Sequence, residues 1–234
     1  MTRDNISVLI RLEHKESRQE LIVGNVHIHW DPSYRDVKLL QTIMLIEELE
    51  KMSAVHPKAA IMVCGDFNSL PGSGVCTFLE SGTVPPDHPD FMEHTYEPYT
   101  TEGAFHSLNL RNAYSISPDP MTFTSFTPMF LGVIDYIWFR PGNLSVSGCL
   151  GPVPTDYAKQ IVGMPSQHLP SDHVSLLAEF RIESVSQGSF TPTSFTSKKE
   201  QQGGGLKYST SNPDLTGSSS SSRRLFSRNK NAMR

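Results

Sequence analysis

The chain has 234 residues, enough to bury a substantial core in one large domain or two small ones. Its formal net charge of −4 excludes the overall basic excess typical of many nucleic-acid-binding proteins, so any polyanion site must be local. Its three scattered cysteines form no CxxC zinc pair and no disulfide framework. Since the sequence shows neither a long apolar span nor a signal peptide, we expect a cytoplasmic and nuclear protein with no membrane partner.

The N-terminal part of the chain predicts a hairpin followed by a covered helix. The apolar runs 6–13 and 21–30 flank a charged, turn-forming segment, which is typical of two antiparallel strands. Asp31 and Pro32 then predict a helix start, with Asp31 as the N-cap and Pro32 as the first helical residue. The helix is apolar nearly all round over residues 37–46, which indicates a crossover helix covered by other elements.

The middle of the chain predicts an α/β fold. The run AAIMVCG (59–65) is continuously apolar, as expected for a strand buried on both faces. Further strands are predicted at 133–140, 144–150 and 173–182, with long polar connections at 83–104 and 152–172. Connections of this length are typical of loops that carry function.

The composition changes near residue 183, after which Ser, Thr, Gly, Gln and basic residues dominate. Such a segment has too little apolar surface to offset the entropy of ordering. The sequence therefore predicts a domain over 1–182 and a disordered tail over 183–234. The tail is interpreted mainly as a solvated terminus, with RNA contact or phosphorylation as the alternative.

Two polar groups stand at the ends of predicted strands. Asn25, His27 and His29 alternate along one strand and are therefore expected on one face of it. Asp66 and Asn68 directly follow the buried strand. Each group has a simpler explanation, because Asp and Asn are common turn formers and strand histidines are commonly structural.

Two further groups strengthen the prediction of a site. Asp135 lies among apolar neighbours, so its carboxylate requires a donor, for which a histidine is the natural choice. Asp172 and His173 precede the last predicted strand. Carboxylate and amide oxygens are the ligands that Mg²⁺ prefers. Together the residues predict a magnesium site for phosphoryl chemistry, where Asp66 and Asn68 position the attacking water and a phosphate-bound metal.

Five segments resemble a known family in order and spacing: NVHIHWDP, DVKLLQ, GDFNSLPGSGV, SFTPMFLGVIDYIWF and LPSDHVSLLAEF. They resemble the C-terminal half of the nuclease domain of carbon catabolite repressor protein 4 type poly(A) deadenylases, of the endonuclease/exonuclease/phosphatase superfamily. The resemblance covers residues 1–182 and implies a partial two-sheet α/β sandwich of the DNase I-like type. It also implies a Mg²⁺-dependent 3′-to-5′ exoribonuclease that shortens poly(A) tails and releases AMP.

The resemblance implies a role for each residue of the predicted metal centre. Asp66 is similar to the carboxylate that activates or orients the attacking water and binds metal. Asn68 is similar to the amide that contacts the metal-bound phosphate, and Asp172 lies near the metal. His173 is similar to the histidine that stabilises the pentavalent phosphorus, with Asp135 as its orienting partner.

The remaining implied roles concern the substrate. His27 is similar to the phosphate-side histidine of the family, and His29 ranks below it. Pro32 and Phe130 are similar to residues that sandwich an adenine base, although ordinary packing is an alternative for Phe130. The implied partners are single-stranded RNA with a poly(A) 3′ end and subunits of the Ccr–Not complex.

The sequence also departs from this family. Its members carry a metal-binding glutamate and an asparagine in early strands, as well as a docking repeat region, and the chain shows no counterpart of either. Glu13 and Glu20 flank the hairpin turn and fit the glutamate poorly. We therefore expect one sheet with an uncovered inner face. As the alternative to an active nuclease, the chain would be a catalytically inactive fragment that at most binds RNA or a partner. Another superfamily branch, such as a DNA endonuclease or a phospholipid phosphodiesterase, is disfavoured by HWDP and FTPMF.

Overall fold

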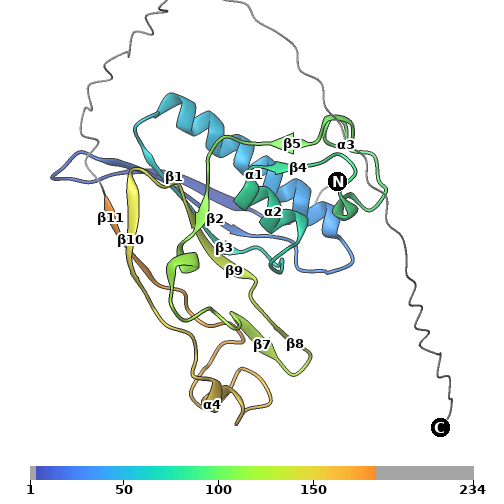
Figure 1. Cartoon of the computed structure of the whole chain (residues 1–234), viewed down its shortest axis with the longest axis vertical. Coiled ribbons are helices and arrows are strands. Elements are labelled where there is room, and N and C mark those ends of the chain that lie inside the picture. The colour runs from blue at the N-terminus through green and yellow to red at the C-terminus, as the bar shows by residue number, and fades with distance from the viewer. Residues whose placement is uncertain (1–3, 183–234) are drawn as a thin grey trace, which may run out of the picture. The chain divides into compact units, whose positions relative to one another are not determined.

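A mixed five-stranded sheet forms the centre of the computed structural model, which describes residues 4–182 (Figure 1). Its strands, in spatial order, are β1 (Ser7–Glu13), β2 (Glu20–His27), β3 (Ala60–Asp66), β9 (Asp135–Phe139) and β6 (Arg111–Asn112). Only β2 and β3 pair in parallel, and the other neighbours are antiparallel. The α/β class is confirmed, while the predicted tail 183–234 lies outside the described residues.

Two helices cover one face of this sheet. Helix α1 (Arg35–Val55) connects β2 to β3, and α2 (Gly74–Ser81) follows β3. The helices and the sheet share one hydrophobic core, in which Ile43 and Leu49 of α1 pack with Val63 of β3. Full burial of each such side chain contributes about 1.5–3 kcal/mol to the stability of the fold. The apolar run within 37–46 therefore forms the covered crossover helix that the sequence predicts.

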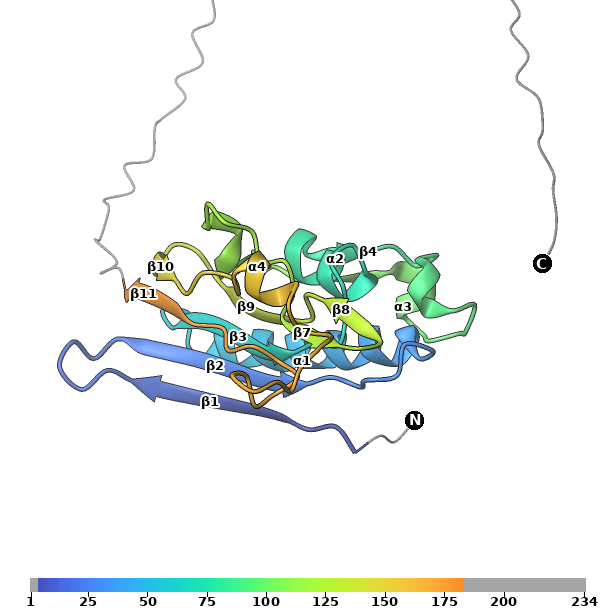
Figure 2. The ribbon, with the colours of Figure 1, turned by 90° about the horizontal axis from the view of Figure 1, so that it is seen from below.

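The opposite face of the sheet is only partly covered. Strands β10 (Leu144–Cys149) and β11 (Ala178–Ile182) pair with each other and pack beside β9, where the rings of Phe139 and Phe180 lie 5.3 Å apart. At the other edge of the sheet, β1 carries an alternating row of exposed apolar side chains: Val8 (55%), Ile10 (46%) and Leu12 (46%). Figure 2 shows β1 at this edge, followed by β2 and β3. This exposed row agrees with the expected uncovered face.

The long connection after α2 is fastened to α1. It contains β4 (Thr83–Val84), the short 3₁₀ turn η1 (Pro89–Phe91), α3 (Tyr99–Glu102) and β5 (Ala104–Phe105). The buried carboxylate of Asp36 accepts hydrogen bonds from His94 and Tyr96, and Glu47 accepts one from the Tyr99 hydroxyl at 2.7 Å. The connection is therefore an ordered wall of the domain.

The remaining elements follow β5 and surround β9. They are η2 (Ala113–Ile116), the antiparallel pair β7 (Ser125–Thr127) and β8 (Phe130–Gly132), and α4 (Thr155–Ala158). The sequence analysis missed the β7–β8 hairpin, because strands of three residues are too short to show an alternating pattern. Within residues 4–182, no helix combines the length and hydropathy that crossing a bilayer requires.

Two predicted element starts and one predicted strand end were wrong. Asp31 does not cap α1; its side chain accepts the Ser33 N–H at 2.8 Å and closes a turn that contains Pro32. The helix begins at Arg35 and its N-cap, Tyr34, makes no side-chain capping bond. Strand β2 ends at His27 rather than at residue 30, and β11 begins at residue 178 rather than 173. At the start of α1, the local turn closed by Asp31 outweighed the helix-capping pattern.

We expect Gly65→Ala to destabilise the domain severely. Gly65 has φ +136°, and a Cβ atom there would lie 2.0 Å from the carbonyl oxygen of Val26, which the parallel ladder holds in place. The expected loss in the free energy of unfolding is roughly 3 kcal/mol or more, measured by urea denaturation followed by circular dichroism.

The matched control is Gly72→Ala. Gly72 also has a positive φ, +84°, but open space surrounds the position where its Cβ would lie. It should cost only about 1–2 kcal/mol, the price of a left-handed conformation. Equal losses for both variants would show that the close approach at Gly65 is unimportant.

Candidate active site

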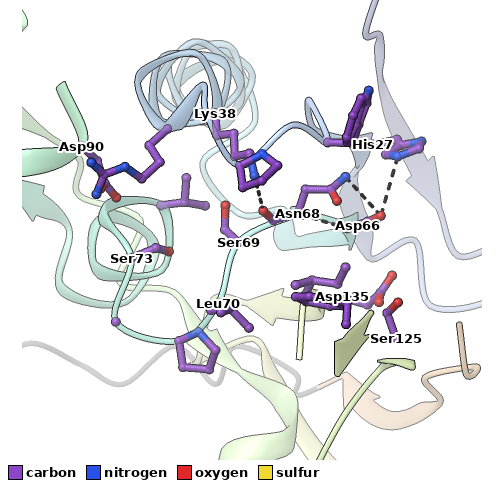
Figure 3. Close-up of a pocket in the computed structure, with 18 of the residues that line it drawn as sticks. His27, Lys38, Asp66, Asn68, Ser69, Leu70, Ser73, Asp90, Ser125 and Asp135 are labelled. Carbon is purple, nitrogen blue, oxygen red and sulfur yellow. Dashed lines mark hydrogen bonds and ion pairs between the residues drawn. The ribbon is translucent and has the colours of Figure 1, made fainter. Parts of the chain in front are cut away.

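Three predicted site residues form one row across neighbouring strands. His27 of β2 pairs in register with Asp66 of β3, and Asp66 pairs with Asp135 of β9. Residues paired in this way project from the same face of a sheet. Figure 3 shows the imidazole of His27 directed toward Asp66, with its Nε2 3.6 Å from the Asp66 Oδ2. The row lies at the end of β2 and β3, on the face opposite α1.

His173 completes the group from a distant part of the chain. Its Nδ1 lies 2.8 Å from the Asp135 Oδ2, and its Nε2 lies 4.0 Å from the Asp66 Oδ2. A bridge to Ser125 of β7 holds the backbone of His173 beside the sheet. Asp135 thus has the histidine partner that its apolar neighbours led us to expect.

The position of Asp135 itself depends on Thr124. The fully buried Thr124 hydroxyl oxygen accepts the backbone N–H groups of Ile134 and Asp135 at 2.9 and 3.0 Å. These bonds satisfy two donors at the point where the chain enters β9. The sequence analysis missed Thr124, since a threonine near a strand has no distinctive spacing.

The pKa values of Asp66 and His173 are both raised, for different physical reasons. Burial raises the pKa of Asp66 above its ordinary value, the N–H of Asn68 offsets this in part, and the charge of Asp135 raises it further. Burial alone lowers the pKa of His173, but the hydrogen bond and charge of Asp135, with the charge of Asp66, outweigh burial and raise it. The group therefore favours a positive charge between its carboxylates.

Asn68 lies in a turn that ties it to Asp66. Its backbone is left-handed, with φ +47°, a conformation that Asn tolerates better than most residues. Its backbone N–H donates to Asp66 Oδ1 at 2.7 Å, and its Nδ2 donates to Ile28 O at 2.9 Å. The Nδ2 also donates to Asp66 Oδ2 at 3.2 Å (Figure 3). The amide oxygen accepts no hydrogen bond from the described residues, which leaves it available to a ligand.

A metal ion fits the donor set of this group. The ligand atoms of Asp66, Asp135 and His173 all lie within 4.8 Å of one another. Two carboxylates and an adjacent amide oxygen suit a hard cation, whose charge would offset the burial of Asp66. Asp172, a predicted metal ligand, has an exposed side chain and lies at the pocket but outside these three converging residues.

The group opens into a pocket of about 1390 Å³. Pro32 and Phe130, the predicted base-binding residues, both line it, and Phe130 is 38% exposed. Trp30 and Met129 add apolar surface, which sequence reasoning did not assign. A pocket of this size, lined by both acidic and apolar side chains, could hold a nucleotide-sized ligand.

Two residues of the predicted histidine face do not join the site. His29 lies beyond the end of β2 and is buried, with its ring 5.5 Å from that of Tyr34, and it does not line the pocket. The expectation that His29 shares a face with His27 was wrong because β2 ends between them. Asn25 shares the face but does not line the pocket, and its amide donates to the Cys64 sulfur.

The connection between α2 and β5 supplies a wall that the sequence analysis missed. His88 and Asp90 line the pocket. Asp90 is fixed by Arg35 at 3.1 Å and by the backbone N–H of Gly74 at 2.7 Å. Their contribution had no sequence signal, because it depends on how a polar loop folds back on α1.

Curated relatives match most of this chain. The CCR4-Not complex 3′-5′-exoribonuclease subunit Ccr4 of Schizosaccharomyces pombe is 44% identical over 205 residues, which cover 78% of this chain and 30% of the relative. The same subunit from Mycosarcoma maydis is 41% identical over 215 residues, covering 82% and 32% respectively. The chain thus spans about a third of the length of these relatives.

Solved structures share the fold. ANGEL2, a 2′,3′-cyclic phosphatase in complex with adenosine-2′,3′-vanadate, superimposes with a TM-score of 0.65 at 24% identity, covering 78% of this chain and 62% of ANGEL2. The human Nocturnin catalytic domain with bound sulfate gives a TM-score of 0.57 at 24% identity, covering 78% and 55%. At these identities the likeness establishes the DNase I-like fold.

A sequence model of the Endonuclease/Exonuclease/phosphatase family matches residues 10–173. This range contains His27, Asp66, Asn68, Asp135 and His173, the residues that the structure brings to one end of the sheet. The chain therefore belongs to the Endonuclease/Exonuclease/phosphatase family.

Proposed function

We propose that this chain is the C-terminal part of a Mg²⁺-dependent 3′-to-5′ exoribonuclease that shortens poly(A) tails and releases AMP. The observation that carries the proposal is the row of His27, Asp66 and Asp135, closed by His173, beside a pocket lined by Pro32 and Phe130. The identity to Ccr4 exoribonuclease subunits supports RNA as the substrate class and a Ccr4-Not type complex as partner.

The geometry supports a distinct task for each residue. Asp66 orients the attacking water and accepts its proton, for which its raised pKa is suited. Asp135 holds the Nδ1–H tautomer of His173, so that Nε2 points toward Asp66 and the reacting phosphate. Asp66, the Asn68 amide oxygen and, by the sequence interpretation, Asp172 would hold Mg²⁺, which supplies positive charge at the phosphate when bound.

The pocket supports recognition of an unpaired base. Stacking between a ring and an apolar face is the usual way proteins hold single-stranded RNA. Phe130 presents a half-exposed ring from β8, and Pro32 presents an exposed ring from the turn after β2. The two residues come from separate segments, the turn after β2 and strand β8, and both line the pocket.

The second candidate is an inactive fragment that binds RNA or a partner. It is favoured by the exposed apolar row on β1 and by the chain's coverage of about a third of its relatives. Turnover of RNA distinguishes the two candidate functions. With Mg²⁺ and an oligoadenylate-tailed RNA, the proposed function gives stepwise 3′ shortening by the purified chain, whereas the fragment gives binding alone.

We expect Asp66→Asn to reduce the rate of shortening by roughly 10²-fold or more, because the amide cannot accept the proton of the water. The control is Asp156→Asn, which changes an exposed carboxylate on α4 and should leave the rate unchanged. Circular dichroism establishes that both variants fold. A folded Asp66→Asn chain with the wild-type rate would remove Asp66 from the proposed mechanism.

Phe130→Ala should weaken binding of the adenine by the loss of one stacking contact, about 1–3 kcal/mol. We expect KM for oligoadenylate to rise, and the preference over oligouridylate to shrink, in gel-based shortening assays. Phe105→Ala is the matched control, since Phe105 is 81% exposed on β5 and does not line the pocket. Unchanged base preference in Phe130→Ala would refute the sandwich.

Activity should fall as pH rises through the raised pKa of His173, above the ordinary value of 6.5, because the imidazolium loses its charge. The same group contributes stability that is complete below 6.5 and is lost as pH rises through the folded-state pKa. Urea denaturation in EDTA across pH 5.5–9, for the native chain and His173→Gln, measures this difference. Parallel pH profiles of the two proteins would contradict the assignment.

A further inference from the structure

Lys38 is a buried cation within the apolar part of α1. Its side chain is only 6% exposed, and it lies in the same helical turn as the buried Leu39 and Thr42. The Nζ atom donates to the carbonyl oxygen of Asn68 at 2.8 Å (Figure 3). Among the described residues, no carboxylate lies within 4.0 Å of this ammonium, so a main-chain carbonyl is its recorded partner.

Burial of an ammonium group without a carboxylate partner in contact is unfavourable. Burial lowers the pKa of Lys38, while the charges of Asp31, Asp66 and Asp90 act in the opposite direction. A leucine or methionine at this position would pack in the core without that cost. Lys38 therefore makes the domain less stable than an apolar residue at this position would. What Lys38 provides instead is its hydrogen bond to the Asn68 carbonyl.

The turn that receives this bond is anchored at three consecutive residues. Phe67 is fully buried, and its N–H donates to Ile134 O at 2.9 Å. Asn68 O accepts from Lys38, and Ser69 O accepts from the Tyr136 hydroxyl at 2.9 Å. A left-handed residue such as Asn68 persists only where its surroundings hold it. The anchors on either side come from the β9 region. The Asn68 side chain is held by Ile28 O and Asp66, and its backbone carbonyl is held by Lys38 of α1.

We infer that Lys38 is a positioning residue, which fixes the peptide of Asn68 so that the amide of Asn68 and the carboxylate of Asp66 keep their relative orientation. The Asn68 N–H donates to Asp66 Oδ1, and the Asn68 carbonyl accepts from Lys38. These two groups belong to the adjacent peptide units on either side of the Asn68 Cα. Loss of the Lys38 bond releases the turn and, with it, both oxygen donors. The catalytic consequence rests on the proposed function, but the ordering of the turn does not.

The test measures hydrogen exchange of backbone amides by NMR in the full chain, without metal or RNA. In Lys38→Met, which keeps the length and packing of the side chain, the Asn68 amide should exchange about tenfold faster or more. The amide of Ile61, in the buried strand β3, should keep its protection. Lys38→Arg should restore protection at Asn68, because the guanidinium retains a donor and the charge. Lys51→Met, an exposed lysine of the same helix, is the matched control.

Each outcome bears on the inference. Unchanged exchange at Asn68 in a folded Lys38→Met chain overturns it. Equal loss of protection at Asn68 and Ile61 also overturns it, since Lys38 would then support the whole core rather than the turn. If Lys38→Met does not fold, Lys38→Gln, whose side chain ends one atom short of the Lys38 Nζ position and therefore does not reach the Asn68 carbonyl, must show selective loss at Asn68. A chain that shows the predicted exchange but no nuclease activity would retain this inference and lose the proposed function.

Discussion

The register between β2, β3 and β9 is the constraint on which the site depends. It places His27, Asp66 and Asp135 side by side, although the first and the last are 108 positions apart in the chain. A shift of one residue in either pairing would turn a carboxylate toward α1 and into the apolar core. The close approach at Gly65, where β3 meets β2, belongs to the same constraint because it allows the row to form.

Two partly buried carboxylates at the end of a sheet repel each other and need nearby positive charge or hydrogen-bond donors. The surrounding groups supply some of these. Burial raises the pKa of Asp66, and Asp135 adds to the effect. His173 supplies positive charge and the N–H of Asn68 supplies a hydrogen bond. A divalent cation could neutralise the negative charge that remains.

The support for the site comes from both faces of the sheet. On the helical face, α1 holds the Asn68 turn through Lys38 and holds the pocket wall through Arg35. Beside β9, the buried Thr124 fixes the entry of Asp135, and the bridge from β7 fixes His173. The exposed apolar row of Val8, Ile10 and Leu12 lies on β1, the edge strand beside β2.

The sequence alone determined the α/β class, the buried strand that ends at Asp66, the covered helix and the candidate residues of the metal centre, because apolar periodicity and isolated polar residues leave local signals. Only the tertiary structure decided that His29 turns away, and that Thr124, Lys38 and the wall near Asp90 support the pocket. These contacts join segments far apart in the chain, and a residue that acts through such a contact carries no pattern in its own neighbourhood.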